Sequence, residues 1–544
     1  MPTSTAARIG WAVFILATLY VCYFSHLGAI GFVGPDEPRY SWIARDMAET
    51  GDWVTPRLYG KPWFEKPPLF YWGAALSFKL FGVSEAAARL PSAISALLAT
   101  LALAWRALRL YGAETARWLL LLLPTTVGMI GFSHAAATDM PFSAMLTIAM
   151  VCAAVVLGLT RDENSSVVRQ TPWLALILFG FFLGLAVLAK GPAAIILSCG
   201  AVFFWAVFAN RWRDAFRLLN PVAIAAFCVT ALPWYILCAR RNPDFFRVFI
   251  IEHNFKRYLT PEFQHIKPFW FYGPIILIAF VPWTLMFVGL LKDLLSKQKV
   301  SLSFSHLYLC CWAAFPVVFF SISRSKLPGY ILPTVFPLGL LLARAIMVRV
   351  RKSVKWIGIA SGAAIFGVTL AIYSLPFAID YFPPGPFRWL EPLDWLVAIG
   401  VVVLGFRRRT SLALIVTVAC LLCTFGVGLA GDASWALDLG TSARWASRVP
   451  KGVSREYWTS HTSTYKLQRS FLYGLNFYLH KEVPEWNGNT EGRNWVFTTP
   501  TEMMELRARR LECPHFMAFP PLIVCEAGGS ADSFPRSGEA QQEK

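Results

Sequence analysis

Residues 63–68 (WFEKPP) place a glutamate beside a lysine inside a run of aromatic residues. The ammonium of Lys66 can bind a phosphate group, and the carboxylate of Glu65 can bind a sugar hydroxyl, an amine, a metal ion or a proton. Pro67 restricts Lys66 to an extended backbone, which would turn the lysine away from the helix that follows. The pair therefore predicts a polar site beside an apolar surface.

Six further polar clusters interrupt the apolar sequence. Together with Glu65 and Lys66 they make seven clusters, and we predict that all seven lie on the outer side of a membrane. The six are Asp36, Glu37, Arg39 and Tyr40; Asp139; Lys190; Glu252, His253, Lys256, Arg257 and Tyr258; His265 and Lys267; and Arg324, Lys326 and Tyr330.

Each cluster taken alone also has a plain structural explanation. Asp36 could be only a helix cap. Lys190 and Lys326 could be loop lysines that extend to the interface, and His265 could be an interfacial histidine. The pairs Arg240/Arg241 and Lys256/Arg257 could face lipid phosphates. Seven clusters on one side are harder to explain separately, and we interpret them as the lining of one functional cavity.

The elements that position these residues are expected to be membrane-spanning helices. The 544 residues are 56% hydrophobic and only 15% charged, and the mean hydropathy is +0.51. Apolar runs recur at about 20 residues, the length that crosses about 30 Å of hydrocarbon. The predicted fold is an all-α polytopic membrane domain with about 13 transmembrane helices. The expected spans are 9–32, 87–108, 114–133, 138–159, 172–189, 192–209, 220–239, 269–291, 306–322, 329–348, 355–375, 391–406 and 411–430.

We expect the chain to divide into a transmembrane domain, 1–430, and a small soluble C-terminal domain, 431–544, of α/β or α+β type. Lys and Arg concentrate in one set of alternate loops, which predicts a cytoplasmic N-terminus and an outer, periplasmic C-terminal domain. Residues 38–49 and 69–81 are expected to form helices that lie in the membrane interface. In the first of these, one face carries Tyr40, Ile43, Ala44 and Met47.

The formal net charge of +18 is explained by these cytoplasmic loops, so nucleic-acid binding is not expected. No nucleotide-binding glycine loop is found, and no nucleotide cofactor is expected. Most of the 11 cysteines lie in predicted spans, whereas Cys513 and Cys525 lie in the C-terminal domain and could form a disulfide. Cations and carboxylates beside an aromatic surface suit a sugar phosphate delivered on a polyprenyl lipid.

The ordered motifs resemble those of the membrane glycosyltransferases of the type C fold, which use polyprenyl-phosphate sugars. The resemblance extends to the protein O-mannosyltransferase superfamily and, within it, to the bacterial 4-amino-4-deoxy-L-arabinose lipid A transferases. It covers roughly 9–430. The motifs are PDEPRY at 35–40, GDWVTPRLYGKPWFEKPPL at 51–69, TDMP at 138–141, AKGP at 189–192, EHNFKRY at 252–258, HIKPFWFY at 265–272 and SKLPGYILP at 325–333.

This resemblance implies a periplasmic active site in a bacterial inner membrane. Asp36 would be an essential acid, Lys66 would meet the donor phosphate, and Asp139 would be the acid that begins the fourth span. Glu65, with His265, could hold a divalent metal ion such as Zn or Mg. We add a predicted substrate-binding set: Glu37, Arg39, Tyr40, Lys190, Arg257, Tyr258, Lys326 and Tyr330.

The resemblance also implies an undecaprenyl-phosphate sugar as donor and lipid A or another envelope molecule as acceptor. Asp36 would position substrate if the acceptor is a phosphate, and would be a general base if the acceptor is a hydroxyl. Two alternatives stay open: a protein or glycan O-glycosyl transferase, and, from another class, a lipid-linked sugar flippase or secondary transporter. No motif of the family is found in the C-terminal domain. The resemblance favours 4-amino-4-deoxy-L-arabinose or a related sugar as the group transferred, with a lipid A phosphate as acceptor.

Overall fold

The computed structural model describes most of the 544 residues of the chain. Arg257, Tyr258, His265 and Cys513 lie outside the described residues, so the predictions made for them stay predictions. The described residues are 4–160, 172–249, 267–288, 303–378, 391–430, 432–449, 453–486, 494–508, 516–519 and 521–527.

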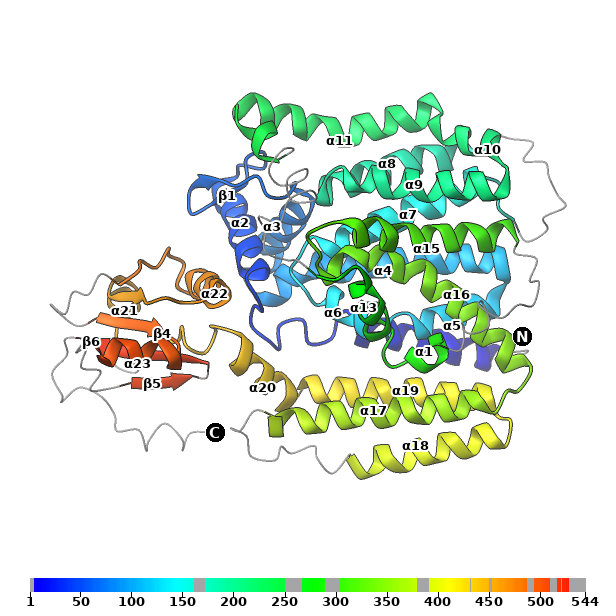
Figure 1. Ribbon diagram of the computed structural model, residues 1–544. Helices are drawn as coiled ribbons and strands as arrows, with labels where there is room; N and C mark the ends of the chain where they lie inside the picture. Colours follow the sequence, from blue (N-terminus) through cyan, green and yellow to red (C-terminus); the bar gives the residue numbers. More distant parts are fainter. Residues whose placement is uncertain are drawn as a thin grey trace.

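Long apolar helices run side by side and form a bundle (Figure 1). Among the described residues, eight helical stretches are long and apolar enough to cross a membrane, and a bent pair would make nine. The chain is thus a multi-pass membrane protein, as the hydropathy predicted. The eight comprise α1 (Thr5–Tyr23), α4 (Glu85–Tyr111), α7 (Asp139–Val156), α8 (Trp173–Lys190), α11 (Pro221–Arg241), α15 (Phe304–Ile322), η4 (Pro328–Ile331) with α16 (Leu332–Arg351), and α19 (Thr410–Ala430).

Other apolar helices complete the bundle at the remaining predicted spans. The bent pair, α5 and α6, turns by 64° after Pro124, which cannot continue a helix without losing a hydrogen bond. These helices are α5 (Ala113–Leu122), α6 (Val127–Ser133), α9 (Ala193–Ala209), η3 (Phe269–Phe271) with α13 (Tyr272–Ala279), α17 (Trp356–Ala378) and α18 (Glu391–Phe406). The short helices α10 (Trp212–Phe216) and η1 (Arg217–Leu219) lie in the connection between α9 and α11.

Two predicted spans were wrong in extent. The span expected at 9–32 is helical only to Tyr23, because a turn follows in which His26 adopts a positive φ of 58°. The span expected at 269–291 is interrupted after Ala279, just before Pro282, whose ring removes a backbone donor. In both places the apolar composition continued beyond the helix, so hydropathy alone could not locate its end.

The segment between α1 and α4 forms a cap on one end of the bundle. It contains α2 (Asp36–Thr50), a two-stranded hairpin of β1 (Arg57–Leu58) and β2 (Lys61–Pro62), and α3 (Leu69–Phe81). Both predicted helices are confirmed, and α2 buries the predicted face of Tyr40, Ile43, Ala44 and Met47. These side chains pack against α3 in a core of their own.

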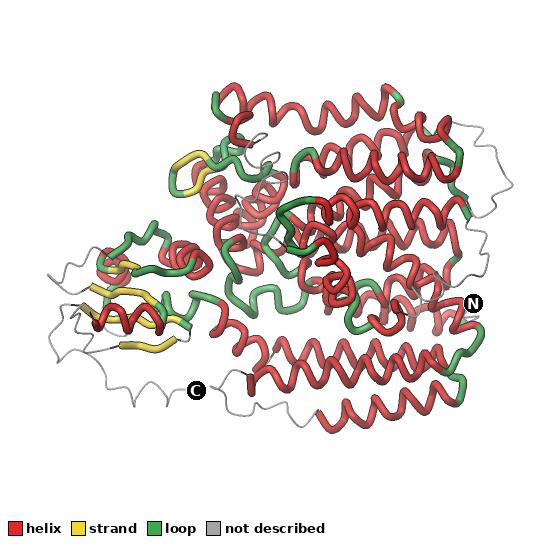
Figure 2. Tube along the Cα trace, viewed as in Figure 1, coloured by secondary structure: helices red, strands yellow, loops and turns green. Residues whose placement is uncertain are grey.

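The C-terminal domain, defined here as the described part of Asp432–Ala527, lies at the same end of the bundle as α2 (Figure 1). Apart from the short hairpin, the strands belong to this domain (Figure 2). Its sheet has the order β3-β4-β6-β5, with β3 parallel to β4 and the other pairs antiparallel. The mixture of helices and strands agrees with the prediction. The elements are α20 (Asp432–Thr441), α21 (Arg455–Ser460), β3 (Thr462–Thr464), α22 (Arg469–Leu479), β4 (Asn494–Thr498), α23 (Pro500–Ala508), β5 (Phe516–Phe519) and β6 (Leu522–Ala527).

Candidate active site

Four charged side chains from two adjacent segments form an open ionic cluster: Asp36, Arg39, Glu65 and Lys66. Arg39 joins the segments, because its Nη2 lies 2.5 Å from Asp36 Oδ1 and 3.0 Å from Glu65 Oε2. Lys66 Nζ lies 3.7 Å from Glu65 Oε1. Two cations and two carboxylates from the motifs PDEPRY and WFEKPP thus meet in one place.

Local structure brings the open cluster together. Asp36 begins α2, but the helix is capped by Pro35 and no side chain makes a capping hydrogen bond. The alternative that Asp36 is only a helix cap is therefore wrong. Instead its carboxylate faces Arg39 one turn later in the same helix, which is the usual spacing for a helical side-chain pair. Glu65 and Lys66 end the segment that precedes α3, where Pro68 occupies the N-cap position.

Asp36 differs from the other members of the open cluster in its exposure. Half of its side chain is exposed (50%), whereas the Arg39 and Lys66 side chains are each 12% exposed. Partial desolvation nevertheless raises the pKa of the Asp36 carboxyl above its usual value. The charge of Arg39 opposes that rise, and the nearby Glu65 adds to it. An accessible carboxylate beside two held cations suits contact with a substrate.

A second ionic group comes from three helix ends. Asp139 is the first residue of α7 and Lys190 is the last of α8, and Lys190 Nζ lies 2.5 Å from Asp139 Oδ1. The same ammonium lies 4.9 Å from the ring centre of Tyr330 in η4. A side chain at Gly329 would collide with the Asp139 carboxylate. Three distant motifs, TDMP, AKGP and SKLPGY, therefore converge on one point.

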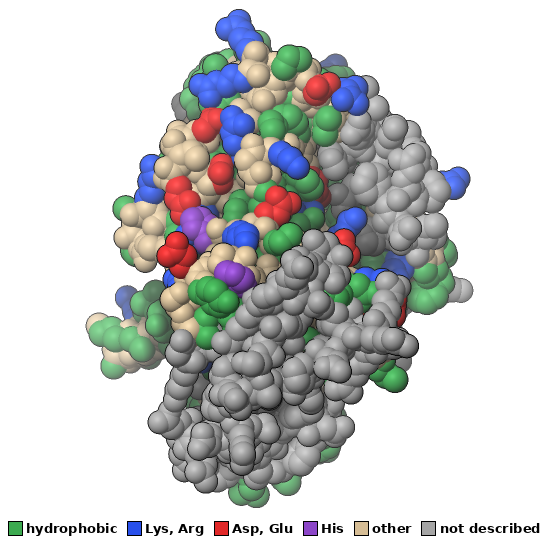
Figure 3. Space-filling view, turned by 90° about the vertical axis from the view of Figure 1, so that its left-hand side faces the viewer, with side chains coloured by type: hydrophobic (Ala, Val, Ile, Leu, Met, Phe, Trp, Pro, Cys, Tyr) green, Lys and Arg blue, Asp and Glu red, His purple; other side chains and the backbone are tan. Residues whose placement is uncertain are grey.

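The two ionic groups are close enough to influence one another. The negative charge of Asp139 contributes to the raised pKa of Asp36, and Lys66 opposes it. The end of the molecule that carries α2 and the C-terminal domain presents Lys, Arg, Asp, Glu and His side chains beside hydrophobic ones (Figure 3). Most of the sequence-predicted residues among those described therefore belong to one electrostatic site.

Three predicted substrate-binding residues are more buried than expected. Glu37 is 6% exposed and Tyr40 is 2% exposed, and Tyr40 packs between Phe70 and Tyr71. Lys326 is also 6% exposed, and its Nζ donates to the carbonyl oxygen of Ser323 at 2.5 Å. Their contact with substrate stays a prediction. In the structure, all three side chains are packed among protein groups beside the site.

Glu37 belongs to a closed ionic cluster with Arg89, a residue at the start of α4 that the sequence interpretation missed. Arg89 Nε and Nη2 donate to the two Glu37 oxygens at 2.9 and 2.7 Å. The backbone amides of Val33 and Ala136 donate to the same carboxylate at 2.7 and 2.6 Å. The only sequence signal for Arg89 was an arginine inside an apolar segment.

The predicted metal site can be tested on Glu65 alone, because His265 lies outside the described residues. Each Glu65 oxygen faces a cation, Arg39 or Lys66. Two neighbouring positive charges disfavour a divalent cation by repulsion. Among the described residues, no group of three His, Cys, Asp or Glu side chains is placed to hold a metal ion. The described residues therefore do not fit a metal site, and no catalytic step is derived through one.

Aromatic rings surround Arg39. The ring centres of Tyr40, Trp63 and Tyr473 lie 5.1, 5.5 and 5.7 Å from its guanidinium carbon, within the range of cation–π contacts. Tyr473 belongs to α22 of the C-terminal domain. Sequence reasoning did not identify it, since a single tyrosine on an amphipathic helix carries no distinctive pattern.

Comparisons with known proteins show what the chain is similar to. Residues 10–249 match the family model described as dolichyl-phosphate-mannose-protein mannosyltransferase. Two curated relatives, from Edwardsiella ictaluri and Aeromonas hydrophila, are undecaprenyl phosphate-alpha-4-amino-4-deoxy-L-arabinose arabinosyl transferases. The first is 34% identical over 61% of this chain and 59% of that protein, and the second is 32% identical over 68% of this chain and 66% of that protein. The chain thus spans less than two thirds of the length of these relatives.

A solved structure has the same fold over nearly the whole chain. The crystal structure of ArnT from Cupriavidus metallidurans bound to undecaprenyl phosphate aligns with 97% of this chain and 99% of that chain. The TM-score is 0.71 and the sequence identity is 22%. The family model, the curated relatives and the solved structure all indicate similarity to the same group of membrane glycosyltransferases. The chain therefore resembles members of the protein O-mannosyltransferase superfamily, and it has the type C membrane glycosyltransferase fold.

Proposed function

We propose that this protein is a glycosyltransferase that moves a sugar from an undecaprenyl-phosphate donor to an acceptor on the periplasmic side of the inner membrane. The sugar would be 4-amino-4-deoxy-L-arabinose or a related one, and the acceptor a lipid A phosphate. The observation that carries this proposal is the open cluster. Arg39 and Lys66 hold two positive charges beside an accessible carboxylate at the end of an apolar helix bundle.

The names of the relatives support the choice of donor and sugar. The curated relatives are named as arabinosyl transferases for undecaprenyl phosphate-alpha-4-amino-4-deoxy-L-arabinose, and the ArnT structure with this fold was solved with undecaprenyl phosphate. A lipid donor also suits a site that lies where the apolar helices end, because the polyprenyl chain can remain in the hydrocarbon while its phosphate reaches the cations.

The reaction replaces one bond at the anomeric carbon. The bond from that carbon to the phosphate oxygen breaks, and undecaprenyl phosphate leaves with the electron pair. An acceptor oxygen forms the new bond from the opposite face, which inverts the anomeric configuration. Lys66 and Arg39 would stabilise the charge that develops on the leaving phosphate. Glu65 holds both cations and so fixes where that stabilisation is applied.

The role of Asp36 depends on the acceptor. A lipid A phosphate is already an anionic nucleophile, so Asp36 would position the sugar or the acceptor. A hydroxyl acceptor must lose a proton, and Asp36, whose pKa is raised by desolvation, would then take it as general base. The Asp139–Lys190 pair, which is electrostatically coupled to Asp36, would form the opposite wall of the site.

The proposed orientation places the N-terminus in the cytoplasm. The N-terminus and the C-terminal domain lie at opposite ends of the bundle (Figure 1), which supports this arrangement together with the charge of the loops. Labelling of engineered single cysteines in intact cells would test it. A periplasmic reagent is expected to label a cysteine placed at exposed Tyr457, and labelling at the N-terminal end of α1 instead would contradict the orientation.

A second candidate is a protein or glycan O-glycosyl transferase that uses a polyprenyl-phosphate sugar. The match of residues 10–249 to the mannosyltransferase family model favours it. The two candidates share the donor chemistry at Arg39 and Lys66 and differ in the acceptor.

One experiment separates the two candidates. The purified protein would be incubated with lipid A and an undecaprenyl-phosphate aminoarabinose donor, and the products read by mass spectrometry. A pentosamine added to a lipid A phosphate is the expected product. Envelope glycolipids from cells with and without the gene would be compared in parallel. An unchanged lipid A together with a hexose lost from a protein or another glycan would favour the second candidate and contradict the first.

A further inference from the structure

Helix α22 of the C-terminal domain contacts α2, the helix that begins with Asp36. Its Tyr473 ring lies against the Arg39 guanidinium, and its Phe477 ring meets Phe32 edge-on with the ring centres 4.7 Å apart. At the end of α22, His480 Nδ1 lies 3.0 Å from Arg45 Nη2. The contacts therefore run along the length of α22.

The same helix also contacts the segment that leads to Glu65 and Lys66. Asn476 Nδ2 donates to the hydroxyl oxygen of Tyr59 at 2.8 Å. Tyr59 and Gly60 have φ values of 52° and 75°, and they form the tight turn between β1 and β2. Positive φ at both central residues is the type I′ geometry, which is unusual for a tyrosine. Helix α22 thus bridges the two segments that supply the open cluster.

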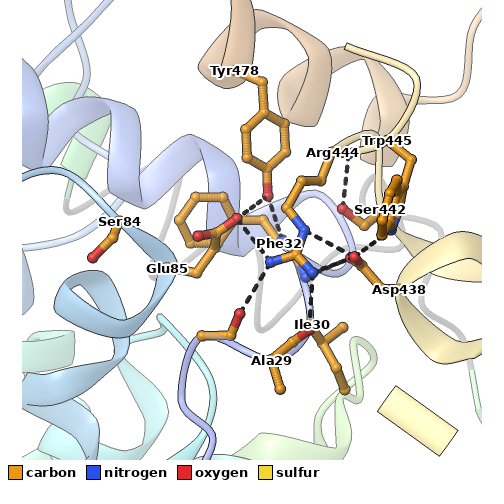
Figure 4. A network of polar contacts seen from close by, with 12 residues as sticks. Ala29, Ile30, Phe32, Ser84, Glu85, Asp438, Ser442, Arg444, Trp445 and Tyr478 are labelled. Atoms are coloured by element: carbon orange, nitrogen blue, oxygen red, sulfur yellow. Dashed lines mark hydrogen bonds and ion pairs between the residues drawn. The ribbon is translucent and has the colours of Figure 1, made fainter. Parts of the chain in front are cut away.

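A buried polar network fixes the C-terminal domain in this position (Figure 4). Arg444 donates to the carbonyl oxygens of Gly28 and Ala29 at 3.0 and 2.8 Å, and it pairs with Asp438. Asp438 in turn accepts from the Gly31 amide at 2.6 Å. Figure 4 shows Arg444, Asp438 and Tyr478 converging on the turn that precedes α2.

Tyr478 extends this network from α22 itself. Its hydroxyl accepts from the Phe32 amide at 2.9 Å and donates to Glu85 Oε1 at 2.9 Å. Tyr473 lies five residues before Tyr478 on the same helix, so its position is fixed by an anchored helix and not by a loop. This rigidity is what a residue needs in order to hold another side chain in one orientation.

Arg39 is a side chain that needs such support. Its ion pairs with Asp36 and Glu65 both use Nη2, and its Nε is buried with no hydrogen-bond partner among the described residues. Ion pairs at one nitrogen leave the guanidinium plane free to turn about that contact. Flanking rings restrict this rotation, because a guanidinium prefers to lie over an aromatic face.

We infer that Tyr473 of the C-terminal domain is a positioning residue of the active site, which holds the Arg39 guanidinium toward the donor phosphate through its ring. The inference rests on the proposed function for the identity of the ligand. It gives the C-terminal domain a part in donor binding that acts through Arg39, so that the membrane domain alone contains an incomplete site. The hydroxyl of Tyr473 is not required by this role, whereas the ring is.

The test uses the full-length protein in detergent with undecaprenyl phosphate as probe. Tyr473→Ala is expected to weaken probe binding and lower kcat/KM by about tenfold, the scale of a partly desolvated cation–π contact. Tyr473→Phe should stay within about twofold of the unchanged protein. Tyr457→Ala is the matched control, because Tyr457 lies in the same domain against His461 and Trp495. It should leave both measurements unchanged.

A double-mutant cycle distinguishes positioning from a general loss of structure. Tyr473→Ala should have little further effect on probe binding when Arg39 is already alanine. An equal loss in both backgrounds would overturn the inference, as would a Tyr473→Phe variant as defective as Tyr473→Ala.

A third measurement does not depend on the proposed function. Phenylglyoxal modifies arginine side chains, and Tyr473→Ala should raise the rate of Arg39 modification several-fold, read by peptide mass spectrometry. An unchanged rate would overturn the inference. Failure of the unchanged protein to bind undecaprenyl phosphate would contradict the proposed function instead, and the modification rate would still decide whether Tyr473 holds Arg39.

Discussion

Asp36 and Glu37 are adjacent in the sequence, yet they belong to two different ionic clusters. Asp36 is half exposed and pairs with Arg39 in the open cluster. Glu37 is 6% exposed, and it pairs with Arg89 and accepts two backbone amides in the closed cluster. The difference shows how one motif can supply both a reactive group and the support that holds it. The carboxylate of Asp36 is open to a substrate, whereas the buried carboxylate of Glu37 already accepts four hydrogen bonds.

The closed cluster acts on the open one through the backbone between them. Arg89 also donates to the carbonyl oxygens of Leu27, Ile30 and Gly31 at 2.8, 2.6 and 2.8 Å. These carbonyls belong to the connection from α1 to α2, which is not helical and whose polar groups need partners. The closed cluster therefore fixes where α2 begins, and so where Asp36 lies.

The largest expected effect comes from breaking the closed cluster. Glu37→Ala would leave the Arg89 guanidinium buried without its carboxylate, and the free energy of unfolding should fall by about 3–5 kcal/mol. Thermal and denaturant unfolding of the purified protein would measure the change. A Glu37→Ala protein as stable as the unchanged one would contradict the structural role given to this cluster.

Breaking the open cluster should abolish activity and leave the fold intact. Lys66→Ala and Asp36→Asn are each expected to lower turnover by at least about a hundredfold, the scale of a group that acts in the transition state. The unfolding midpoint should change far less than for Glu37→Ala, since the substituted groups do not complete a buried network. Near-normal turnover of either folded variant would remove that residue from the proposed mechanism.

The pH dependence of activity and of stability gives a further test of the difference between the open and closed clusters. Desolvation raises the pKa of Asp36, so the acid limb of the pH–rate profile should lie above the pH at which an ordinary aspartate titrates. A raised pKa means that the native state binds the proton more tightly than the unfolded chain, so ionisation of Asp36 lowers stability as the pH rises through this range.

Asp36→Asn should therefore be neutral or slightly stabilising at pH 7, and its stability difference from the unchanged protein should vanish in acid. Unfolding midpoints measured across the pH range would check the sign. A variant that is clearly less stable at pH 7 would show that the ion pair with Arg39 outweighs the cost of desolvation.

The smallest effect is expected from an ion pair outside both clusters. Arg351 pairs with Glu114 at 2.5 Å, but the two side chains are 65% and 41% exposed. Water and salt screen such a pair, so Arg351→Ala should change the free energy of unfolding by less than about 1 kcal/mol. Activity should not change. A larger loss of unfolding free energy would indicate that the exposure of an ion pair does not by itself predict how much the pair contributes to stability.

Much of the architecture was determined by local sequence pattern. Apolar runs of spanning length predicted the bundle, and helical periodicity predicted that Tyr40, Ile43, Ala44 and Met47 would be buried together on α2. Charged residues that interrupt apolar sequence identified Asp36, Lys66, Asp139 and Lys190 as neighbours of one site. These predictions succeeded because the membrane makes exposed charge and unpaired backbone unfavourable, so their positions along the chain carry strong information.

Only the tertiary structure decided which charges pair and which stay accessible. Arg39 meets Glu65, 26 positions away in the sequence, and Glu37 turns inward to Arg89 while Asp36 turns outward. Tyr473 reaches Arg39 from the C-terminal domain, although no motif marked it. Periodicity reports which face of a helix is apolar, but pairing and burial depend on which surfaces pack together. That choice is made by contacts between segments far apart in the chain.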